Sequence, residues 1–235
     1  MDPAEQIATI PLFEGLLPQQ LRELAAIVRR QTYERGQLIF AEGDEASGLY
    51  VVGQGRVKIF KLSPEGKEQI LHLFGPGEPF GEAALFAGRH FPAYAEGLDQ
   101  TTILFFPRRA LIDLIQRNPD IALSLLAVLS LRLRVFANLI EDLSLKEVPA
   151  RLAAYLLYFT RRTGQSAELE LDITKSQLAS LLGTIPETLS RVLARMSRQG
   201  LIESEGRRIK LLDKKGLEEL AGYDLRLPES PQGEE

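Results

Sequence analysis

Four polar residues occupy five consecutive positions and carry the groups best suited to reading a DNA base edge: Glu187, Thr188, Ser190 and Arg191. An arginine can donate two hydrogen bonds to guanine, a glutamate can accept one from the amino group of cytosine, and a serine hydroxyl can meet a thymine edge. Residues of this kind in the first turn of a helix lie where recognition helices usually touch bases. The segment Pro-Glu-Thr-Leu-Ser-Arg at 186–191 therefore predicts a sequence-specific DNA-reading helix.

Local signals place this helix second in a pair that spans 175–200. Thr174 suits the N-cap of the first helix, and Gly183 suits its left-handed end. Pro186 suits the first position of the second helix, because its missing N–H would have no partner there. An apolar stripe at helical spacing follows and would be buried, formed by Leu189, Val192, Leu193 and Met196.

The remaining face of the pair extends the predicted DNA surface. Arg195 lies on the polar side of the second helix, while Lys175 and Ser176 open the first. The alternative interpretation is an ordinary helix pair with a solvated charged face. The concentration of the polar set in the first turn favours DNA reading over that alternative.

Composition places the chain among soluble globular proteins. It has 235 residues, of which 45% are hydrophobic and 26% charged. We see no apolar run close to the roughly 20 residues that cross a bilayer, and the first ten residues lack the pattern of a signal peptide. We therefore expect a cytoplasmic protein with no membrane partner.

Cysteine and histidine usage narrows the chemistry. The absence of cysteine excludes disulfides, thiolate metal sites and cysteine-ligated iron–sulfur clusters. The two histidines, His72 and His90, lie 18 positions apart with no second ligand motif nearby. We expect no metal site and no catalytic residues, so an enzyme is disfavoured.

Charge is distributed unevenly along the chain. Residues 148–215 hold 12 Lys or Arg and 7 Asp or Glu, a balance of +5, which leaves −9 for the rest of a chain with net charge −4. A mildly basic C-terminal part joined to an acidic larger part fits a regulator better than a non-specific nucleic-acid coat protein.

The region 32–107 has the pattern of an antiparallel barrel or sandwich of jelly-roll type. Short β-type runs alternate with glycine-rich turns at spacings of about 8–12 residues. One turn, Ser-Pro-Glu-Gly at 63–66, has proline and glycine at the positions that a type I turn favours. The runs are 38–40, 48–52, 56–61, 68–74, 94–97 and 101–106.

Helices flank the barrel on both sides in sequence. We expect helices at 18–30, at 108–116 and from Pro119 to about Leu143. The last carries a heptad seam at alternating spacings of three and four, formed by Leu126, Leu129, Leu133, Phe136, Ile140 and Leu143. The seam predicts a homodimer interface, and the alternative is one broad core face with no partner.

The C-terminal part reads as a winged helix-turn-helix. A helix at 150–162 and a strand-like run at 168–173 precede the helix pair, and a hairpin at 201–212 with Gly206 in its turn follows it. The predicted fold class is α+β. Its parts are a barrel domain at 1–118, a dimerisation helix at 119–146, a DNA-binding domain at 147–224 and a disordered tail at 225–235.

In this order of parts the chain resembles the Crp/Fnr family of transcriptional regulators. The motifs that carry the resemblance are residues 186–191, residues 195–201 and Phe-Gly-Glu-Ala-Ala-Leu-Phe at 80–86. The resemblance implies a dimer that reads a palindrome of the TTGAT–ATCAA type through Glu187, Ser190 and Arg191. It also implies a small-molecule or gas effector in a cyclic-nucleotide-binding-type barrel, and contact with RNA polymerase.

The effector site departs from the pattern of the cyclic-AMP-binding members. In those members Gly-Glu is followed by an Arg, which pairs with the cyclic phosphate, while the Glu accepts from a ribose hydroxyl. Here Gly81 and Glu82 are present, but residues 91–93, Phe-Pro-Ala, stand where Arg-Ser belongs, and Arg89 is shifted in register. The departure argues against cyclic AMP. Glu82 has a structural alternative, a hydrogen bond to backbone inside the barrel.

A cysteine-less branch of the family, the regulators of denitrification and nitrosative stress, is also similar to this chain, through residues 80–86, Leu-Ser-Leu-Lys at 143–146 and Tyr-Leu-Leu at 155–157. That resemblance implies sensing of nitric oxide through haem, with His72 or His90 as an axial ligand. The expected effector pocket comprises Gly81, Glu82, His72, Arg89 and His90. Two alternatives stay open: a ligand-independent regulator with a purely structural barrel, and a regulator that responds to a cyclic nucleotide.

Overall fold

The computed structural model describes residues 3–87, 90–163 and 168–222. The chain forms two compact units, Met1–Ala137 and Asn138–Glu235, whose boundary falls inside one long helix. The predicted disordered tail at 225–235 and the pocket candidate Arg89 lie outside the described residues.

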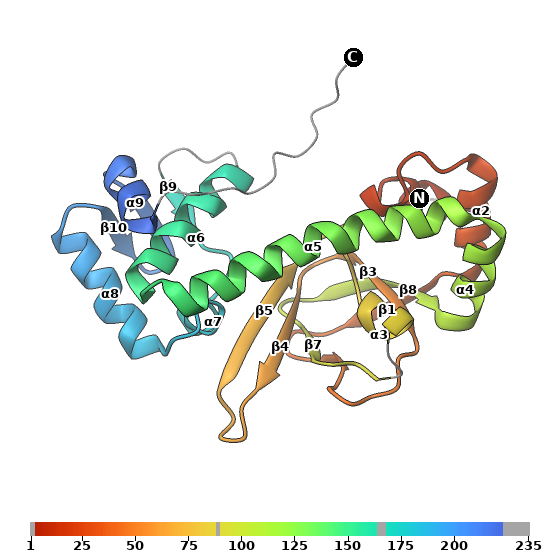
Figure 1. Ribbon diagram of the computed structural model, residues 1–235, viewed down its shortest axis with the longest axis horizontal. Coiled ribbons are helices and arrows are strands. Elements are labelled where there is room, and N and C mark those ends of the chain that lie inside the picture. The colour runs from red at the N-terminus through yellow and green to blue at the C-terminus, as the bar shows by residue number, and fades with distance from the viewer. Residues whose placement is uncertain (1–2, 88–89, 164–167, 223–235) are drawn as a thin grey trace, which may run out of the picture. The chain divides into compact units, whose positions relative to one another are not determined.

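Eight strands of the first unit form two four-stranded antiparallel sheets (Figure 1). One sheet has the order β1-β8-β3-β6, with bounds Arg29–Tyr33, Thr101–Pro107, Gly48–Gln54 and Pro79–Phe80. The other has the order β2-β7-β4-β5, with bounds Leu38–Phe40, Tyr94–Gly97, Val57–Leu62 and Glu68–Phe74. The prediction of an antiparallel jelly-roll-like domain is confirmed, and we call the two sheets the barrel.

The β4–β5 hairpin shows how local sequence sets the strand pairing. The amide of Gly66 donates to the carbonyl of Ser63 at 2.9 Å, and that of Ser63 donates to Lys67 at 2.9 Å. Gly66 has φ +81°, which a residue with a side chain rarely adopts. The predicted Ser-Pro-Glu-Gly turn therefore closes the hairpin.

Aromatic rings fill the space between the two sheets. They come from both sheets and from the segment before β7, and their exposed fractions are 7% or less: Phe40, Tyr50, Phe74, Phe80, Phe91 and Phe105. We call these six residues the aromatic cluster. Small and branched side chains such as Val52, Val57, Ala95 and Ile103 complete this core.

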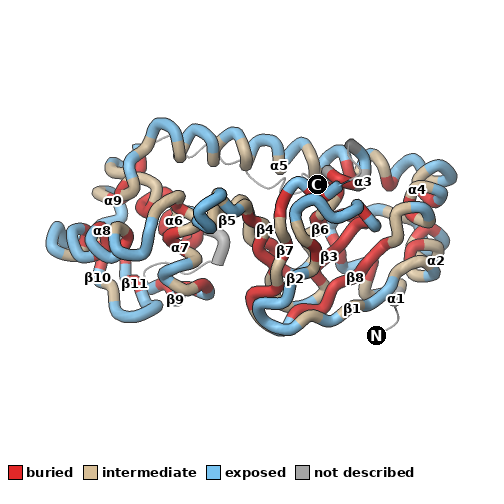
Figure 2. Tube along the Cα trace, turned by 90° about the horizontal axis from the view of Figure 1, so that it is seen from below, coloured by how far each residue is buried: buried red, intermediate tan, exposed pale blue. Residues whose placement is uncertain are grey.

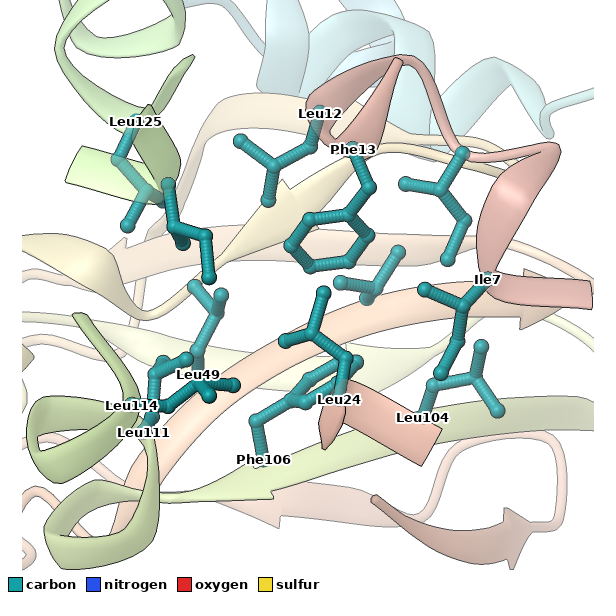
Figure 3. Close-up of a cluster of buried hydrophobic side chains, with 13 residues drawn as sticks. Ile7, Leu12, Phe13, Leu24, Leu49, Leu104, Phe106, Leu111, Leu114 and Leu125 are labelled. Carbon is teal, nitrogen blue, oxygen red and sulfur yellow. The ribbon is translucent and has the colours of Figure 1, made fainter. Parts of the chain in front are cut away.

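A second core joins helices to the outer side of the β1-β8-β3-β6 sheet (Figure 3). The helices are α1 (Pro3–Ala8), the 3-10 helix η1 (Pro11–Phe13), α2 (Pro18–Ile27) and α4 (Arg108–Arg117). Their side chains meet Leu49, Leu104 and Phe106 of the sheet, with Phe13 edge-on to Phe106 at 5.5 Å between ring centroids.

The long helix α5 (Pro119–Leu145) adds its first turns to this second core. Ile121 and Leu125 are fully buried there, whereas much of the helix beyond them is exposed (Figure 2). By length and composition alone, α5 could cross a membrane, since an 18-residue window has mean hydropathy 1.8. The sequence shows no uninterrupted apolar run of that length there, because serine and arginine residues interrupt the apolar ones.

The second unit has the elements of a winged helix-turn-helix. Three helices, α6 (Val148–Thr163), α7 (Lys175–Leu181) and α8 (Pro186–Arg198), are followed by α9 (Lys214–Ala221). A three-stranded antiparallel sheet has the order β10-β11-β9, with bounds Ile202–Glu205, Arg208–Leu211 and Glu168–Glu170. Gly206 has φ +62° in the β10–β11 turn, as predicted.

Several element boundaries differ from the sequence prediction. The helix expected to reach Arg30 ends at Ile27, and β1 begins at Arg29, because pairing with β8 extends the backbone there. The strand expected to reach Ile173 ends at Glu170, where its ladder with β11 ends. Three short helices, α1, α3 (Glu82–Ala87) and α9, were not expected.

Candidate nucleic-acid interface and effector site

The caps around α7 and α8 hold the predicted reading helix in place. The side chain of Thr174 accepts from the amide of Gln177 at 3.2 Å, and the Gln177 side chain accepts from the Thr174 amide at 2.8 Å. Gly183 ends the α7 region with φ +65°, and Pro186 occupies the first turn of α8. The local signals seen in the sequence therefore act at the predicted positions.

The apolar side of α8 is buried and its polar side is open. Leu189, Val192, Leu193 and Met196 are between 0% and 7% exposed, whereas Glu187, Ser190, Arg191 and Arg195 are exposed and Thr188 is half-buried. Nη2 of Arg191 donates to Oγ1 of Thr188 at 3.1 Å, which holds the guanidinium beside the first turn. Lys175 and Ser176 are likewise exposed, at the start of α7.

A surface hollow of about 350 Å³ lies on the exposed side of α8. Its lining residues are Thr188, Arg191, Val192, Ala194, Arg195 and Arg198. Three of these six are arginines, which carry a charge at any pH the protein meets. The hollow therefore presents positive charge next to the predicted base-reading residues, a combination suited to a DNA groove flanked by phosphates.

In the barrel domain, Gly81 directly precedes the short helix α3, and Glu82 is the first residue of that helix. Gly81 has φ +84°, and a Cβ placed there would meet the Tyr50 ring at 3.0 Å. A backbone conformation and a close approach thus both require glycine at this position. Glu82 is only 3% exposed, so its carboxylate sits inside the first unit.

Glu82 is paired with Arg132, a residue that the sequence analysis did not single out. Nη1 of Arg132 forms an ion pair with Oε1 of Glu82, Nη2 donates to the carbonyl of Pro79 at 2.6 Å, and the guanidinium lies 4.7 Å from the centroid of the Phe74 ring. The other carboxylate oxygen, Oε2, is buried and meets no hydrogen-bond partner among the described residues. The predicted alternative of a purely backbone-bonded Glu82 does not describe this arrangement.

A sequence signal for Arg132 did exist. The buried positions Ile121 and Leu125 are followed by half-buried Val128 and Arg132, at spacings of four, three and four. A charged residue on the buried stripe of a helix needs a partner. That spacing pointed to a buried ion pair on the barrel side of α5, although not to Glu82 in particular.

Phe91 occupies the region where the cyclic-AMP-binding pattern has an arginine. Its ring stacks on Phe40, with centroids 3.7 Å apart and planes 10° apart, and it is 2% exposed. Tyr50 stacks on Phe80 at 5.2 Å in the same cluster. Phe91 is therefore held in an apolar contact and offers no positive charge to a phosphate.

The two histidines lie on different elements. His72 is in β5, half-buried, opposite Ile59 in the strand register and 4.4 Å from the Phe74 ring between centroids. His90 is exposed and forms an isolated β-bridge with Glu45. A haem inside the barrel would have to displace the packed rings of the aromatic cluster, so the residues present do not fit that group as they stand.

Tyr50 is the cluster member that carries a titratable group. Burial raises the pKa of its phenol above the ordinary value, the hydrogen bond to Ser47 at 2.9 Å lowers it, and the Asp44 charge raises it. The net effect is a raised pKa. Tyr50 therefore stays a neutral phenol at physiological pH rather than an anionic ligand.

Comparisons with known proteins agree with this architecture. Residues 30–118 match the model of the cyclic nucleotide-binding domain, and residues 150–220 match that of the Crp-like helix-turn-helix domain. The CRP-like cAMP-activated global transcriptional regulator of Mycobacterium tuberculosis is 31% identical over 217 residues, which cover 91% of this chain and 97% of the relative. The chain belongs to the Crp/Fnr family.

Other members of the Crp/Fnr family extend the comparison. The cyclic AMP receptor protein of Thermus thermophilus is 35% identical over 211 residues, covering 90% of this chain and 96% of that protein. The structure of FixK2 from Bradyrhizobium japonicum has a TM-score of 0.75 at 27% identity and covers 84% of this chain and 99% of that chain. The α+β architecture of barrel, long helix and helix-turn-helix is therefore that of the family.

Membership of the Crp/Fnr family settles two general points. The protein is a DNA-binding transcriptional regulator and not an enzyme. The apolar helix α5 belongs to a family of soluble regulators, and its composition does not make it a membrane span.

Proposed function

We propose that the protein is a homodimeric transcription regulator that reads a palindrome of the TTGAT–ATCAA type. The observation that carries the proposal is the exposed face of the first two turns of α8, where Glu187, Ser190 and Arg191 lie outside the buried stripe. Arg191 would donate to guanine, Glu187 would accept from cytosine, and Ser190 would meet a thymine edge. Thr188, Arg195, Lys175 and Ser176 would add sugar and phosphate contacts.

The experiment is a binding measurement with Arg191→Ala. We expect the variant to lose about 1–3 kcal/mol on the palindrome and to relax the preference for guanine at one position of each half-site. Gel-shift titrations against operators with each base at that position measure both effects. Unchanged affinity and preference would refute the assignment, and Lys215→Ala, a substitution on α9 outside the reading face, is the matched control.

Two copies of the reading helix would bind one palindrome. The seam residues Leu126, Leu133 and Ile140 are 57%, 71% and 65% exposed on α5, while Leu129, Phe136 and Leu143 are half-buried. Such a row of exposed apolar residues at heptad spacing supports dimerisation through α5. In a symmetric dimer the two reading helices would address half-sites about one helical turn apart.

We favour a barrel that takes no effector, so that the protein binds DNA without an external ligand. The packed aromatic cluster supports this version, because the six rings occupy the interior of the barrel. The Arg132–Glu82 pair also supports it, because a protein side chain already neutralises the buried carboxylate. The test is the DNA affinity of purified protein with and without added cyclic nucleotides. A change of tenfold or more on addition would overturn this version.

Control by a cyclic nucleotide is the second candidate, and one specific observation favours it. Oε2 of Glu82 is buried without a partner among the described residues, and a ribose hydroxyl could donate to it. Two of the relatives are described as a cAMP-activated regulator and a cyclic AMP receptor protein. Equilibrium dialysis with cyclic AMP, and with Glu82→Gln as control, separates this candidate from the first.

Haem-based sensing of nitric oxide finds less support in the barrel, since His72 and His90 lie on separate elements and the interior is packed. An absorption spectrum with added haem, before and after nitric oxide, tests it directly.

As a regulator of transcription, the protein would act in the cytoplasm and contact RNA polymerase at its target promoters.

A further inference from the structure

Three exposed arginines line the hollow on α8: Arg191, Arg195 and Arg198. Arg191 donates to the hydroxyl of Thr188, and Arg198 donates to a backbone carbonyl of its own helix. Among the described residues, no carboxylate forms an ion pair with any of the three. The hollow therefore holds three positive charges that an anion could neutralise. We call these residues the arginine hollow.

The chain carries an acidic segment directly after α9 and Gly222. Residues 223–235 contain four carboxylates and one cation, Arg226, a balance of 1 − 4 = −3. The carboxylates are those of Asp224, Glu229, Glu234 and Glu235. We call residues 223–235 the acidic segment. Its charge is opposite to that of the arginine hollow in the same unit of the protein.

The acidic segment begins within about one short helix length of the end of α8. The amides of Leu212 and Asp213 donate to the carbonyl of Leu201 at 3.0 and 3.2 Å. Leu201 is three positions after Arg198, so α9 starts beside the end of the arginine hollow. Since α9 has eight residues, its far end lies about 12 Å further on, and the acidic segment follows Gly222 there.

The length of the acidic segment matches the surface that it would cover. A chain of 13 residues spans about 45 Å when fully extended. The helix α8 also has 13 residues and is about 20 Å long. The acidic segment can therefore lie along the helix from Arg198 to Arg191. A short tether also holds a group at a millimolar local concentration, so individually weak ion pairs suffice for contact.

We propose that the acidic segment binds the arginine hollow of its own DNA-binding unit and competes with DNA there. A carboxylate can take the place of a DNA phosphate, because an arginine binds either anion through paired N–H groups. The inference rests on the proposed function, in which the same arginines meet DNA. Because the contact covers all three arginines, it weakens binding to operator and scrambled DNA alike.

The first test removes the charge of the acidic segment and keeps its length. At about 0.1 M salt, the triple variant should bind both the palindrome and a scrambled duplex about threefold or more tighter than the wild-type protein, the factor that three exposed ion pairs of ordinary strength supply. The gain should shrink as salt rises, because screening weakens exposed pairs. Fluorescence anisotropy measures both affinities. The substitutions are Glu229→Gln, Glu234→Gln and Glu235→Gln.

A second triple variant controls for net charge. Glu5, Glu14 and Glu34 are exposed glutamates of the first unit, and their replacement by glutamine raises the net charge by three, as in the first variant. This control should bind both duplexes within about twofold of the wild-type protein, since it leaves the acidic segment unchanged. An equal gain in the two triple variants would overturn the inference, because net charge alone would then explain it.

The contact can also be measured without DNA, since the chain has no cysteine. Ala194 lines the hollow and is exposed, and Gln232 belongs to the acidic segment. The pair Ala194→Cys and Gln232→Cys should form an intramolecular disulfide under mild oxidation. In the background of the three glutamine substitutions the tether is identical, and cross-linking should be about threefold slower or more. Equal rates in the two backgrounds would overturn the inference.

These outcomes separate the inference from the proposed function. If Arg191→Ala lowers operator affinity while the acidic-segment variant binds DNA as the wild-type protein does, the proposed function stands and the inference is overturned. If Arg191→Ala has no effect on the operator, the proposed function fails. The cross-linking rates then still decide whether the acidic segment occupies the arginine hollow.

Discussion

The side chains of Arg132 in α5 and Glu82 in α3 form a buried ion pair, although the two residues are 50 positions apart in the chain. The exposed fractions of the two side chains are 12% and 4%. The same guanidinium reaches the carbonyl of Pro79 and the face of Phe74. One side chain of the long helix is therefore bound to three parts of the barrel unit.

Removing one partner of this pair should be costly. Arg132→Met would leave the Glu82 carboxylate buried without a counter-charge, which typically costs 3–5 kcal/mol. The double variant Arg132→Met with Glu82→Leu should recover much of that loss, because no charge remains to be buried. Urea unfolding followed by circular dichroism measures the three free energies at one protein concentration.

An exposed ion pair in the same unit provides the control for Arg132. Lys61 and Glu42 are paired with exposed fractions of 43% and 37%. Lys61→Met should therefore change the free energy of unfolding by about 1 kcal/mol or less. Equal effects of Lys61→Met and Arg132→Met would contradict a special role for the buried pair.

The winged helix-turn-helix could be predicted closely because its signals are local. Thr174, Gly183 and Pro186 each act within one or two turns of the chain, and an apolar stripe at helical spacing needs no knowledge of the tertiary fold. The jelly-roll class followed in the same way from alternation and turn residues.

The structural features that could not be predicted from the sequence depend on contacts between residues far apart in the chain. The Arg132–Glu82 pair joins segments whose separation in the chain carries no periodic signal. The two-residue strand β6 is set by its pairing with Tyr50 and Val51, and β1 is set by its pairing with β8. The filled interior could not be predicted either, because Phe91 reads as a loop residue until its stack on Phe40 is seen.

The Phe91–Phe40 stack gives a second stability prediction. Phe91→Ala would leave a cavity in the packed aromatic cluster, and truncation of a buried phenylalanine typically costs about 3–5 kcal/mol. Phe86→Ala is a suitable control, because Phe86 is 46% exposed in α3 and should cost much less. Thermal unfolding compares the two, and similar melting temperatures would contradict a packed interior.

Two arginines on the exposed face of α8, Arg191 and Arg198, should contribute to DNA binding in different ways. Arg191→Ala should lower affinity for the correct operator more than for a scrambled sequence, because it reads a base. Arg198→Ala, in the same hollow but at the far end of α8, should weaken both about equally and reduce the salt slope by about one, as expected for a phosphate contact. Titrations at several salt concentrations separate the two, and identical slopes for Arg198→Ala and the wild-type protein would contradict a phosphate contact.

Two tyrosines of the first unit, half-buried Tyr33 and buried Tyr50, predict a loss of stability at high pH. Burial is the main cause that raises the pKa of Tyr33 and of Tyr50 above the ordinary value of about 10. Above that value the unfolded chain releases protons that the folded protein still holds, so the free energy of unfolding is full below about pH 10 and falls as the pH rises through the folded pKa values. Urea unfolding between pH 8 and 11 measures the slope.

Tyr50→Phe should make that alkaline slope shallower, since phenylalanine keeps the ring and removes the ionisable group. The contribution of Tyr33 should remain, so the slope should not vanish in the single variant. An unchanged slope in Tyr50→Phe would show that the buried phenol does not couple folding to pH.

The seam on α5 predicts the oligomeric state. Leu133 is the most exposed seam residue, at 71%, and a symmetric dimer would bury two copies of it. Because burial of one leucine contributes about 1.5–3 kcal/mol, Leu133→Glu should raise the dimer dissociation constant by roughly a hundredfold or more. It should also reduce binding to the full palindrome towards that of a single half-site.

Leu131→Glu is the matched control for the seam, because Leu131 is also on α5, is 49% exposed and lies off the heptad positions. Sedimentation equilibrium at micromolar concentrations should find Leu131→Glu dimeric and Leu133→Glu largely monomeric. If both variants remain dimers, another surface mediates association. If both variants become monomers, the interface is wider than the heptad seam. The overall hydrophobicity of α5, rather than the heptad spacing of its apolar residues, would then determine dimerisation.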